Sequence, residues 1–222
     1  MQRKKQTINY PFTRINQNLH KTLRINLINA LSGFKQAMLL GTCDTNGNTN
    51  LAMIGSITHL SSKPAKLSLL MRAHGLEQNI RRDSLKNIVS TGCFTLNHVH
   101  ADILEAAHQT SAKYEPNISE FEQTGLTPTY SNTLAAPYVE QAHISFGCRF
   151  EKLIDLETNQ LELVIAEIIE ANIPENLFDK EGRVNLSDAG SLAVAGCDYY
   201  HQTIPHALYD LARPGQPPLK LK

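Results

Sequence analysis

Residues 36 to 60 read QAMLLGTCDTNGNTNLAMIGSITHL and contain the clearest strand and turn signals in the sequence. Two apolar runs flank a polar turn at 44–47, where the dipeptide Asn46-Gly47 is a strong signal for a β-hairpin. The second run carries no formal charge from Asn48 to Ser62 and mixes Asn, Ser and Thr with Leu, Met and Ile. The stretch therefore predicts two antiparallel strands, the second of them at 49–60 and unusually polar for a buried element.

Alternation along a strand gives this second run two different faces, because side chains point to opposite sides with period two. The face that mixes small apolar groups with hydroxyl and amide groups consists of Asn50, Ala52, Ile54, Ser56 and Thr58. Such a face suits a flat ring with a polar rim, and Gly55 would let a backbone or a ligand come close. The alternative is an ordinary sheet with one partly solvated face.

Composition limits the class of protein. The chain has 222 residues, zero formal net charge and 41% hydrophobic residues, which suits one domain with extensions or at most two small domains. Balanced charge gives no reason to expect a nucleic acid or an anionic membrane as partner. No segment approaches the ~20 apolar residues of a membrane span, and the basic start MQRKKQ lacks the apolar run of a signal peptide. Four cysteines without a CxxC pair indicate reduced thiols in a cytoplasmic protein.

The remaining elements favour a mainly β protein. Apolar residues spaced by four predict a helix over 13–32, and short helices are expected at 85–90, 101–109 and 118–123. Strands are expected at 66–71, 93–99, 143–156 and 161–173, whereas the proline-rich tail from 196 onward is expected to be irregular. Roughly six strands with short helices between them predict an antiparallel β-barrel with helical insertions.

Common catalytic motifs are missing from the sequence. It contains no GxGxxG, GxxxxGK[ST], GxSxG or HExxH. The spacing of His98, His100 and Glu105 resembles the first metal-binding motif of the cupins, and two imidazoles with a carboxylate are able to hold iron or manganese. However, residues 101–107 are strongly helix-forming and the second cupin motif is missing, so we expect a strand end that passes into an exposed helix and no metal site.

A candidate anion site follows the third strand. Arg72 leaves that strand, and Arg81, Arg82, Asp83 and Ser84 stand at the start of a helix, with Asp83 or Ser84 as its cap. Free backbone N–H groups at a helix N-terminus, together with a guanidinium group, form a cradle for phosphate. The alternative is solvated surface charge with an ordinary cap.

The sequence resembles the flavin reductase-like, FMN-binding split-barrel family over about residues 24–201. The segments that carry the resemblance are NLINALSGFKQAMLLGTCDTNGNTNLAMIGSITHLSSKP, RRDSLKNIVSTGCFTLNHV, AHQTSAKYEPNISEFEQTGLTP, LVIAEIIEANI and GCDYYHQ. The resemblance implies a six-stranded antiparallel Greek-key split β-barrel with helical insertions and an N-terminal helix. It divides the chain into an N-terminal helical extension (1–34), an FMN-binding split-barrel domain (35–201) and an irregular proline-rich tail (202–222).

The resemblance also implies a homodimer that binds FMN near its subunit interface and passes electrons from NAD(P)H to a flavin or another small acceptor. Two other functions stay open: an FMN-binding electron-transfer protein without its own nicotinamide site, and a cupin-like metalloenzyme. No catalytic side chain is expected in the flavin case, because the cofactor carries the chemistry.

The candidate cofactor-binding residues combine the polar strand, the anion cradle and the positions implied by the resemblance. They are Asn50, Leu51, Ala52, Met53, Gly55, Ser56, Ser61, Ser62, Arg72, Arg82, Asp83, Ser84, Asn87, Ser111, Ala112, Tyr114 and Tyr200. Arg72, Arg82, Ser84 and Ser61 are expected to take the phosphate, and Tyr114 and Tyr200 to cover the ring or the substrate. The chain departs from many relatives at Met53 and Ile54, where they have Pro and Phe, and at Ser84, where they have Thr.

Overall fold

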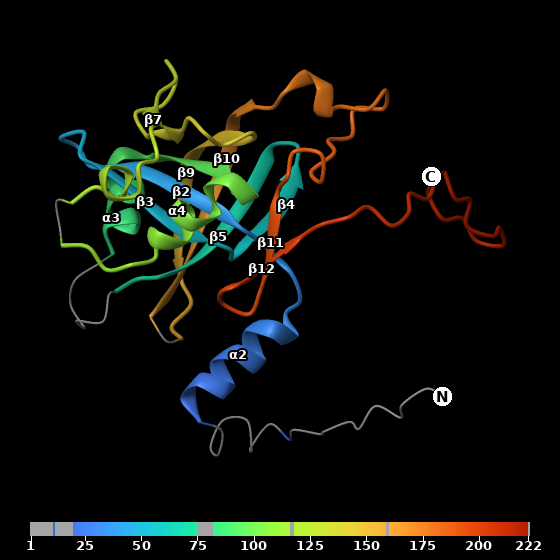
Figure 1. Ribbon diagram of the computed structural model, residues 1–222, viewed down its shortest axis with the longest axis horizontal. Helices are drawn as coiled ribbons and strands as arrows, with labels where there is room; N and C mark the ends of the chain where they lie inside the picture. The colour runs from blue at the N-terminus through green and yellow to red at the C-terminus, as the bar shows by residue number, and fades with distance from the viewer. Residues whose placement is uncertain (1–10, 12–19, 75–81, 116–117, 159, 222) are drawn as a thin grey trace.

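A seven-stranded antiparallel sheet forms the body of the protein (Figure 1). The computed structural model describes residues 11, 20–74, 82–115, 118–158 and 160–221. The order of the strands in the sheet is β3-β2-β6-β9-β10-β5-β4. Their bounds are β2 Met38–Cys43, β3 Thr49–Ile54, β4 Ile57–Ser62, β5 Ala65–Arg72, β6 Cys93–His98, β9 Ser145–Asp155 and β10 Leu161–Asn172. The protein is therefore mainly β, as the sequence predicts.

The two ends of this sheet are consecutive in the chain. β3 pairs with β2 at one edge, β4 pairs with β5 at the other, and only Gly55 and Ser56 separate β3 from β4. The continuous strand predicted over 49–60 is therefore wrong, and the sheet has seven strands in place of six. The predicted face from Asn50 to Thr58 is divided between the two edges.

Gly55 stands at the break for a steric reason. A Cβ atom built on it would lie 3.0 Å from the carbonyl oxygen of Gln36, which is tighter than ordinary contacts. Gln36 belongs to β1 Lys35–Gln36, which forms a separate three-stranded sheet with β11 Leu192–Ala195 and β12 Tyr199–Gln202. The close neighbour that Gly55 admits is thus the backbone of β1.

Two buried clusters fill opposite sides of the main sheet. One unites strand side chains such as Phe94 and Leu69 with Leu85 and Ile88 of α3 Asp83–Thr91. The other packs Leu51 and further strand residues against η1 Ala101–Ile103, α4 Leu104–Gln109 and α5 Glu120–Thr124. A β7–β8 hairpin, Pro128–Thr129 with Tyr138–Val139, and η2 Glu175–Leu177 complete the covering. Burial of apolar area on both faces is the main source of stability.

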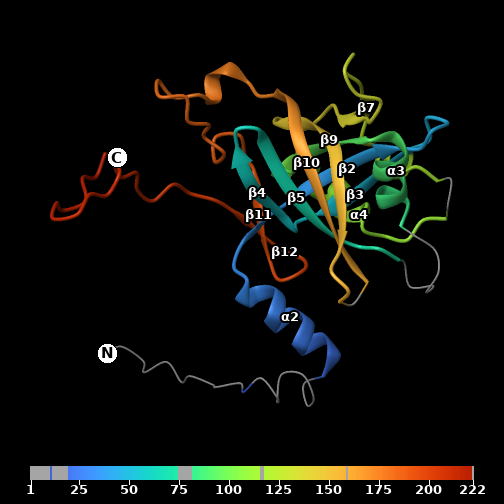
Figure 2. The same cartoon turned by 180° about the vertical axis from the view of Figure 1, so that it is seen from behind.

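The helix α2 Lys21–Leu31 has no buried residue and projects from the sheet, as does the C-terminal tail (Figures 1 and 2). Its bounds confirm the second half of the predicted helix, whereas most of the first half, 12–19, lies outside the described residues. The predicted irregular tail is wrong at its start, because Tyr199–Gln202 forms β12. Strand β11, which pairs with both β1 and β12, was not predicted from the sequence.

Turn and cap residues explain why the predicted hairpin and helices form. The carboxylate of Asp44 accepts hydrogen bonds from the backbone of Asn46 and Asn48, which closes the turn between β2 and β3. Gly92 ends α3 in the left-handed region at φ 72°, a conformation that glycine adopts without strain. The N-cap of α3 is Arg82, which makes no side-chain capping bond, so the predicted cap at Asp83 or Ser84 is one or two residues too late.

Candidate functional site

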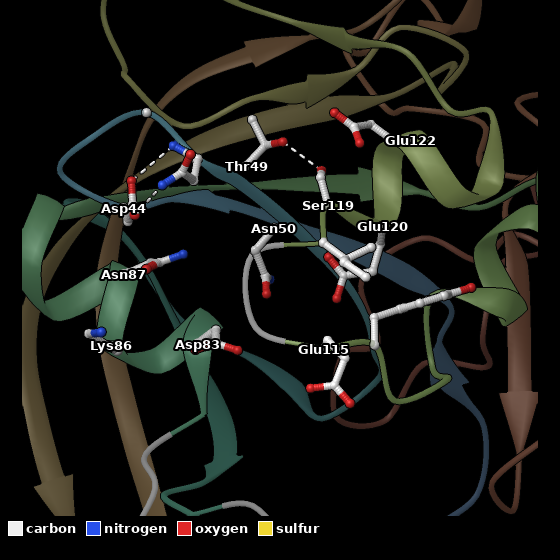
Figure 3. Close-up of a pocket in the computed structure, with 14 residues that line it drawn as sticks. Asp44, Thr49, Asn50, Asp83, Lys86, Asn87, Glu115, Ser119, Glu120 and Glu122 are labelled. Atoms are coloured by element: carbon white, nitrogen blue, oxygen red, sulfur yellow. Dashed lines mark hydrogen bonds between the residues drawn. The ribbon is translucent and has the colours of Figure 1, made fainter.

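The candidate site is a cavity of about 340 Å³ at the beginning of β3 (Figure 3). Its walls come from the β2–β3 turn and β3, from α3, and from the segment that leads into α5. The lining residues are Asp44, Gly47, Asn48, Thr49, Asn50, Asp83, Lys86, Asn87, Tyr114, Glu115, Ile118, Ser119, Glu120 and Glu122. Its volume falls within the range of small-molecule sites.

Hydrogen bonds join the walls of the cavity to one another and to the sheet. The Asn50 amide donates to the hydroxyl of Ser84 on α3 at 2.9 Å, and the hydroxyls of Thr49 and Ser119 lie 2.7 Å apart. Asn87 is buried and donates to Thr42 on β2 at 3.2 Å. Asn50 consequently stands between α3 and the beginning of α5 (Figure 3), and the cavity has side-chain amide and hydroxyl groups on opposite sides.

Charge in the cavity is strongly negative. The lining includes five carboxyl groups, from Asp44, Asp83, Glu115, Glu120 and Glu122, against the single ammonium group of Lys86. Hydrogen bonds from Asn48 hold the pKa of Asp44 below its usual value, so this carboxylate stays ionised. A phosphate inside the cavity would face net repulsion, because one ammonium group does not balance five carboxyl groups.

Glu120 occupies a special position because it caps the edge of the sheet. One of its carboxylate oxygens accepts a hydrogen bond from the backbone N–H of Leu51 at 2.8 Å. Burial raises the pKa of this carboxyl, and the Leu51 N–H works in the opposite direction. A group whose charge is disfavoured by burial is more readily neutralised when a ligand enters.

The Leu51 bond also shows how the edge of β3 is oriented. In an antiparallel ladder alternate residues exchange hydrogen bonds with the neighbouring strand, and the others point away from it. Because Leu51 directs its backbone N–H to Glu120, the backbone N–H groups of Leu51 and Met53 point away from β2. Those of Asn50 and Ala52 point toward β2. The backbone N–H that is available to a ligand near the end of the strand is therefore that of Met53, whereas the N–H of Ala52 is directed to β2 within the sheet.

The two candidate arginines lie near one another, outside the lining of the cavity. The backbone N–H of Arg82 donates to the carbonyl of Ala73 at 3.1 Å, directly after Arg72 at the end of β5. Both arginine side chains are exposed. This end of the molecule thus presents two guanidinium groups next to the uncapped first turn of α3.

The other candidate residues are dispersed. Ser61 pairs with Lys66, which lies six residues before Arg72 on β5, so a distance of about 20 Å separates Ser61 from the arginines. Ser62 is its neighbour on β4, and Ser56 is exposed at the break. Ser111 and Ala112 are exposed after α4, whereas Tyr114 reaches the cavity and accepts a hydrogen bond from Gln109 at 3.0 Å. Tyr200 lies in a different groove.

The histidines of the cupin-like pattern have other partners. His98 Nδ1 lies 2.9 Å from the Ser191 hydroxyl, and His100 Nε2 lies 2.9 Å from the carbonyl oxygen of Gln141. Glu105 is exposed on α4. Within the part of the chain that the structure describes, no three His, Cys, Asp or Glu side chains are arranged to hold a metal ion.

Sequence reasoning missed the acidic wall. Glu120 and Glu122 come from the segment 118–123, which we predicted only as a short helix, and Glu115 precedes it. Three carboxylates in the run EPNISEFE were visible in the sequence, but their approach to β3 depends on the Thr49–Ser119 and Leu51–Glu120 bonds. A density of acidic residues beside a predicted polar strand was the available signal.

The protein thus has an antiparallel sheet whose edge strand β3 borders a polar cavity. The chain belongs to the flavin reductase-like domain family, whose pattern matches residues 31–199. Its fold agrees with a crystal structure from Shewanella frigidimarina, of a protein provisionally assigned as a flavin reductase with a split-barrel domain. The two share 35% identity and a TM-score of 0.87, over 93% of this chain and 100% of that one.

Two other solved structures share the fold at lower identity. Nitrilotriacetate monooxygenase component B from Bacillus cereus is 20% identical with a TM-score of 0.77, over 90% of this chain and 96% of that one. An FMN-binding protein from Thermus thermophilus is 14% identical with a TM-score of 0.62, over 76% and 86%. Among the described residues no helix has the length and apolar character needed to span a membrane.

Proposed function

We propose that this protein is an oxidoreductase that binds FMN beside β3 and passes electrons from NAD(P)H through it to a flavin or another small acceptor. Membership of the flavin reductase-like family supports a flavin as the partner. The observation that carries the proposal is the outward-facing edge of β3 beside a cavity with amide and hydroxyl groups. Such an edge offers backbone donors to the polar rim of a flat ring.

The charge distribution supports one orientation of FMN over the reverse. Five carboxyl groups line the cavity, so the uncharged parts of the cofactor fit there better than its phosphate. Arg72 and Arg82 lie outside that lining, at the free start of α3, and suit the phosphate. We therefore assign the binding of the FMN phosphate to these two arginines, and not to Ser61 or Ser62 of the same chain.

Bound FMN would supply hydride and single-electron transfer, chemistry that requires no protein acid or base. The chain would hold the ring, keep one ring face accessible and place donors where negative charge grows on reduction. Met53 would contribute a backbone N–H, and Asn50 and Asn87 would face the polar parts of the cofactor. Many relatives have Pro at the position of Met53, and Pro has no backbone N–H. With Met at this position, the chain has a backbone donor there.

Absorbance spectroscopy tests the proposal directly. The purified protein, or the protein titrated with FMN, should show a bound-flavin spectrum that bleaches under anaerobic conditions when NADH or NADPH is added. Bound flavin that neither nucleotide bleaches would favour the second function, an electron-transfer protein without a nicotinamide site. A protein that binds no flavin under any condition would refute both.

Substitution of Arg82 tests the phosphate anchor. Arg82→Ala should weaken FMN binding by ~1.5–3 kcal/mol, the typical contribution of a hydrogen bond to a charged group. Arg213→Ala in the exposed tail is the matched control, because it removes the same charge far from α3. Equal FMN affinities for the two variants in a fluorescence titration would place the phosphate elsewhere.

We also propose that the protein works as a homodimer, as the family resemblance implies. Several large apolar side chains are exposed on the described surface, including Leu31 at the end of α2, Phe34 shortly after it and Leu60 on β4. Apolar area of this kind is commonly covered by association. Light scattering at micromolar concentration should give twice the mass of one chain, and a monomer would end this part of the proposal.

A further inference from the structure

A second cavity, of about 490 Å³, lies between α4 and β12 on the protein surface. Its lining consists of Ala101, Leu104, Glu105, His108, Asp198 and Tyr200. Ala101 of η1 and Leu104 of α4 form the apolar part of one wall, and the ring of Tyr200 forms another. A small, shallow groove with an aromatic wall suits a planar ligand.

His108 and Tyr200 form a hydrogen-bonded couple in this groove. His108 Nδ1 lies 2.8 Å from the Tyr200 hydroxyl oxygen, and the two rings are perpendicular with their centroids 5.7 Å apart. Burial, with a smaller contribution from Asp198, raises the pKa of Tyr200, so the phenol stays protonated at neutral pH. When Nδ1–H donates to the phenol oxygen, the phenolic hydrogen is free to donate to a ligand.

The charge of the groove restricts that ligand. Glu105 and Asp198 contribute carboxyl groups, and the lining includes neither lysine nor arginine. A ligand with a carboxylate or phosphate in the groove would meet two negative charges without a counter-charge. Neutral and cationic ligands meet no such penalty.

The groove is also connected to β3 by packing. Tyr200 and Leu104 pack against the same buried cluster that contains Leu51 and is joined by Met53. Met53 lies three residues, or about 10 Å, along the strand from Asn50, which lines the first cavity. The groove and β3 therefore share one buried cluster, and the first cavity lies at the beginning of the same strand.

We propose that the α4–β12 groove binds a planar six-membered ring that carries a carbonyl or carboxamide oxygen and no negative charge, with the Tyr200 hydroxyl donating to that oxygen. The inference rests on the proposed function, in which such a ring would belong either to the nicotinamide donor or to an aromatic carbonyl acceptor. Nicotinamide is cationic when oxidised and neutral when reduced, so both of its states meet the charge requirement.

The test uses the full chain and three small probes of similar size: 1-methylnicotinamide as a cation, acetophenone as a neutral carbonyl compound, and benzoate as an anion. Ligand-observed NMR titrations should show binding of at least one of the first two, at an affinity about tenfold or more above that of benzoate. Tyr200→Phe should weaken this binding about fivefold, the effect of one neutral hydrogen bond. Tyr209→Phe, on the exposed tail, is the control.

Binding of 1-methylnicotinamide alone identifies the donor ring as the ligand, and binding of acetophenone alone identifies the acceptor. Benzoate binding as tight as that of the other probes, or an affinity unchanged in Tyr200→Phe, overturns the inference. Repeating the titrations with and without saturating FMN separates the two claims. If the protein binds a probe in a Tyr200-dependent manner but fails to bind FMN, the proposed function is refuted and the inference that the groove is a ligand site is supported.

Discussion

Acidification should destabilise the protein through His98, at the end of β6. This side chain is mostly buried, with Nδ1 bonded to the hydroxyl of Ser191 and the ring in edge contact with Phe146. Burial lowers the pKa of His98 from 6.5 to about 4, because an imidazolium ion loses its hydration there. The folded protein therefore resists a proton that the unfolded chain accepts.

The sign and size of the effect follow from this shift. A lowered folded-state pKa gives stability that is fully present above pH 6.5 and is lost as the pH falls through about 4. A difference of about 2.5 pKa units corresponds to about 3 kcal/mol of unfolding free energy, at 1.36 kcal/mol per unit. That loss is a large fraction of the stability of a typical domain.

Urea denaturation between pH 7.5 and pH 4 measures the effect. His98→Gln keeps an amide that can bond to Ser191 and removes the titration, so its unfolding free energy should fall about 3 kcal/mol less over this range than that of the wild type. Comparing pH dependences cancels any uniform loss of stability in the variant. His206→Gln, on the exposed tail, should behave like the wild type. Parallel curves for wild type and His98→Gln would refute the reasoning.

Three further predictions follow from close packing and burial. Gly41→Ala places a Cβ atom against the Pro137 carbonyl oxygen, so it should cost about 1–3 kcal/mol in a thermal melt; an unchanged melting temperature would contradict this packing. Because burial raises the pKa of Glu120, stability is lost as pH rises through the folded-state pKa, and Glu120→Gln should flatten that pH dependence in urea titrations while keeping an acceptor for the β3 N–H. A slope equal to that of the wild type would count against it. Tyr138→Phe removes a 2.5 Å bond to Glu170 and should cost about 2 kcal/mol in chemical denaturation, and a neutral result would show that the bond adds nothing.

Features set by short-range chemistry could be predicted from the sequence. The β2–β3 hairpin depends on Asn46-Gly47 and on the Asp44 carboxylate, all within five residues. The ends of α3 and α5 depend on Gly92 and Gly125, both of which adopt positive φ. In these places a few adjacent residues determine the conformation.

Features set by distant partners could not be predicted. The break at Gly55 follows from the approach of Gln36 and from the different neighbours of β3 and β4, which alternation along one strand does not reveal. β11 exists because it pairs with β1 and β12, more than 150 residues from the former. The acidic wall of the cavity likewise depends on the bonds that Ser119 and Glu120 make to β3.

The fold brings together the candidate cofactor-binding residues of β3 and α3. It does not bring the serines of β4 to the same place. Asn50 contacts Ser84, and Asn87 lies in the same cavity wall. Ser61 was included because the family resemblance implies that it helps to hold the phosphate, but within one chain it pairs with Lys66, about 20 Å along β5 from Arg72. The cofactor roles of all these residues stay predictions until FMN binding is measured.

The direct link between β3 and β4 has a consequence for synthesis on the ribosome. Each of these strands has its own hairpin partner early in the chain, but β9 and β10, which join the two hairpins into one sheet, end only at Asn172. Until those residues emerge, the nascent polypeptide has two separate β-hairpins with unpaired edges and few long-range contacts. A version terminated before residue 145 should then be a strong client of chaperones and prone to aggregate.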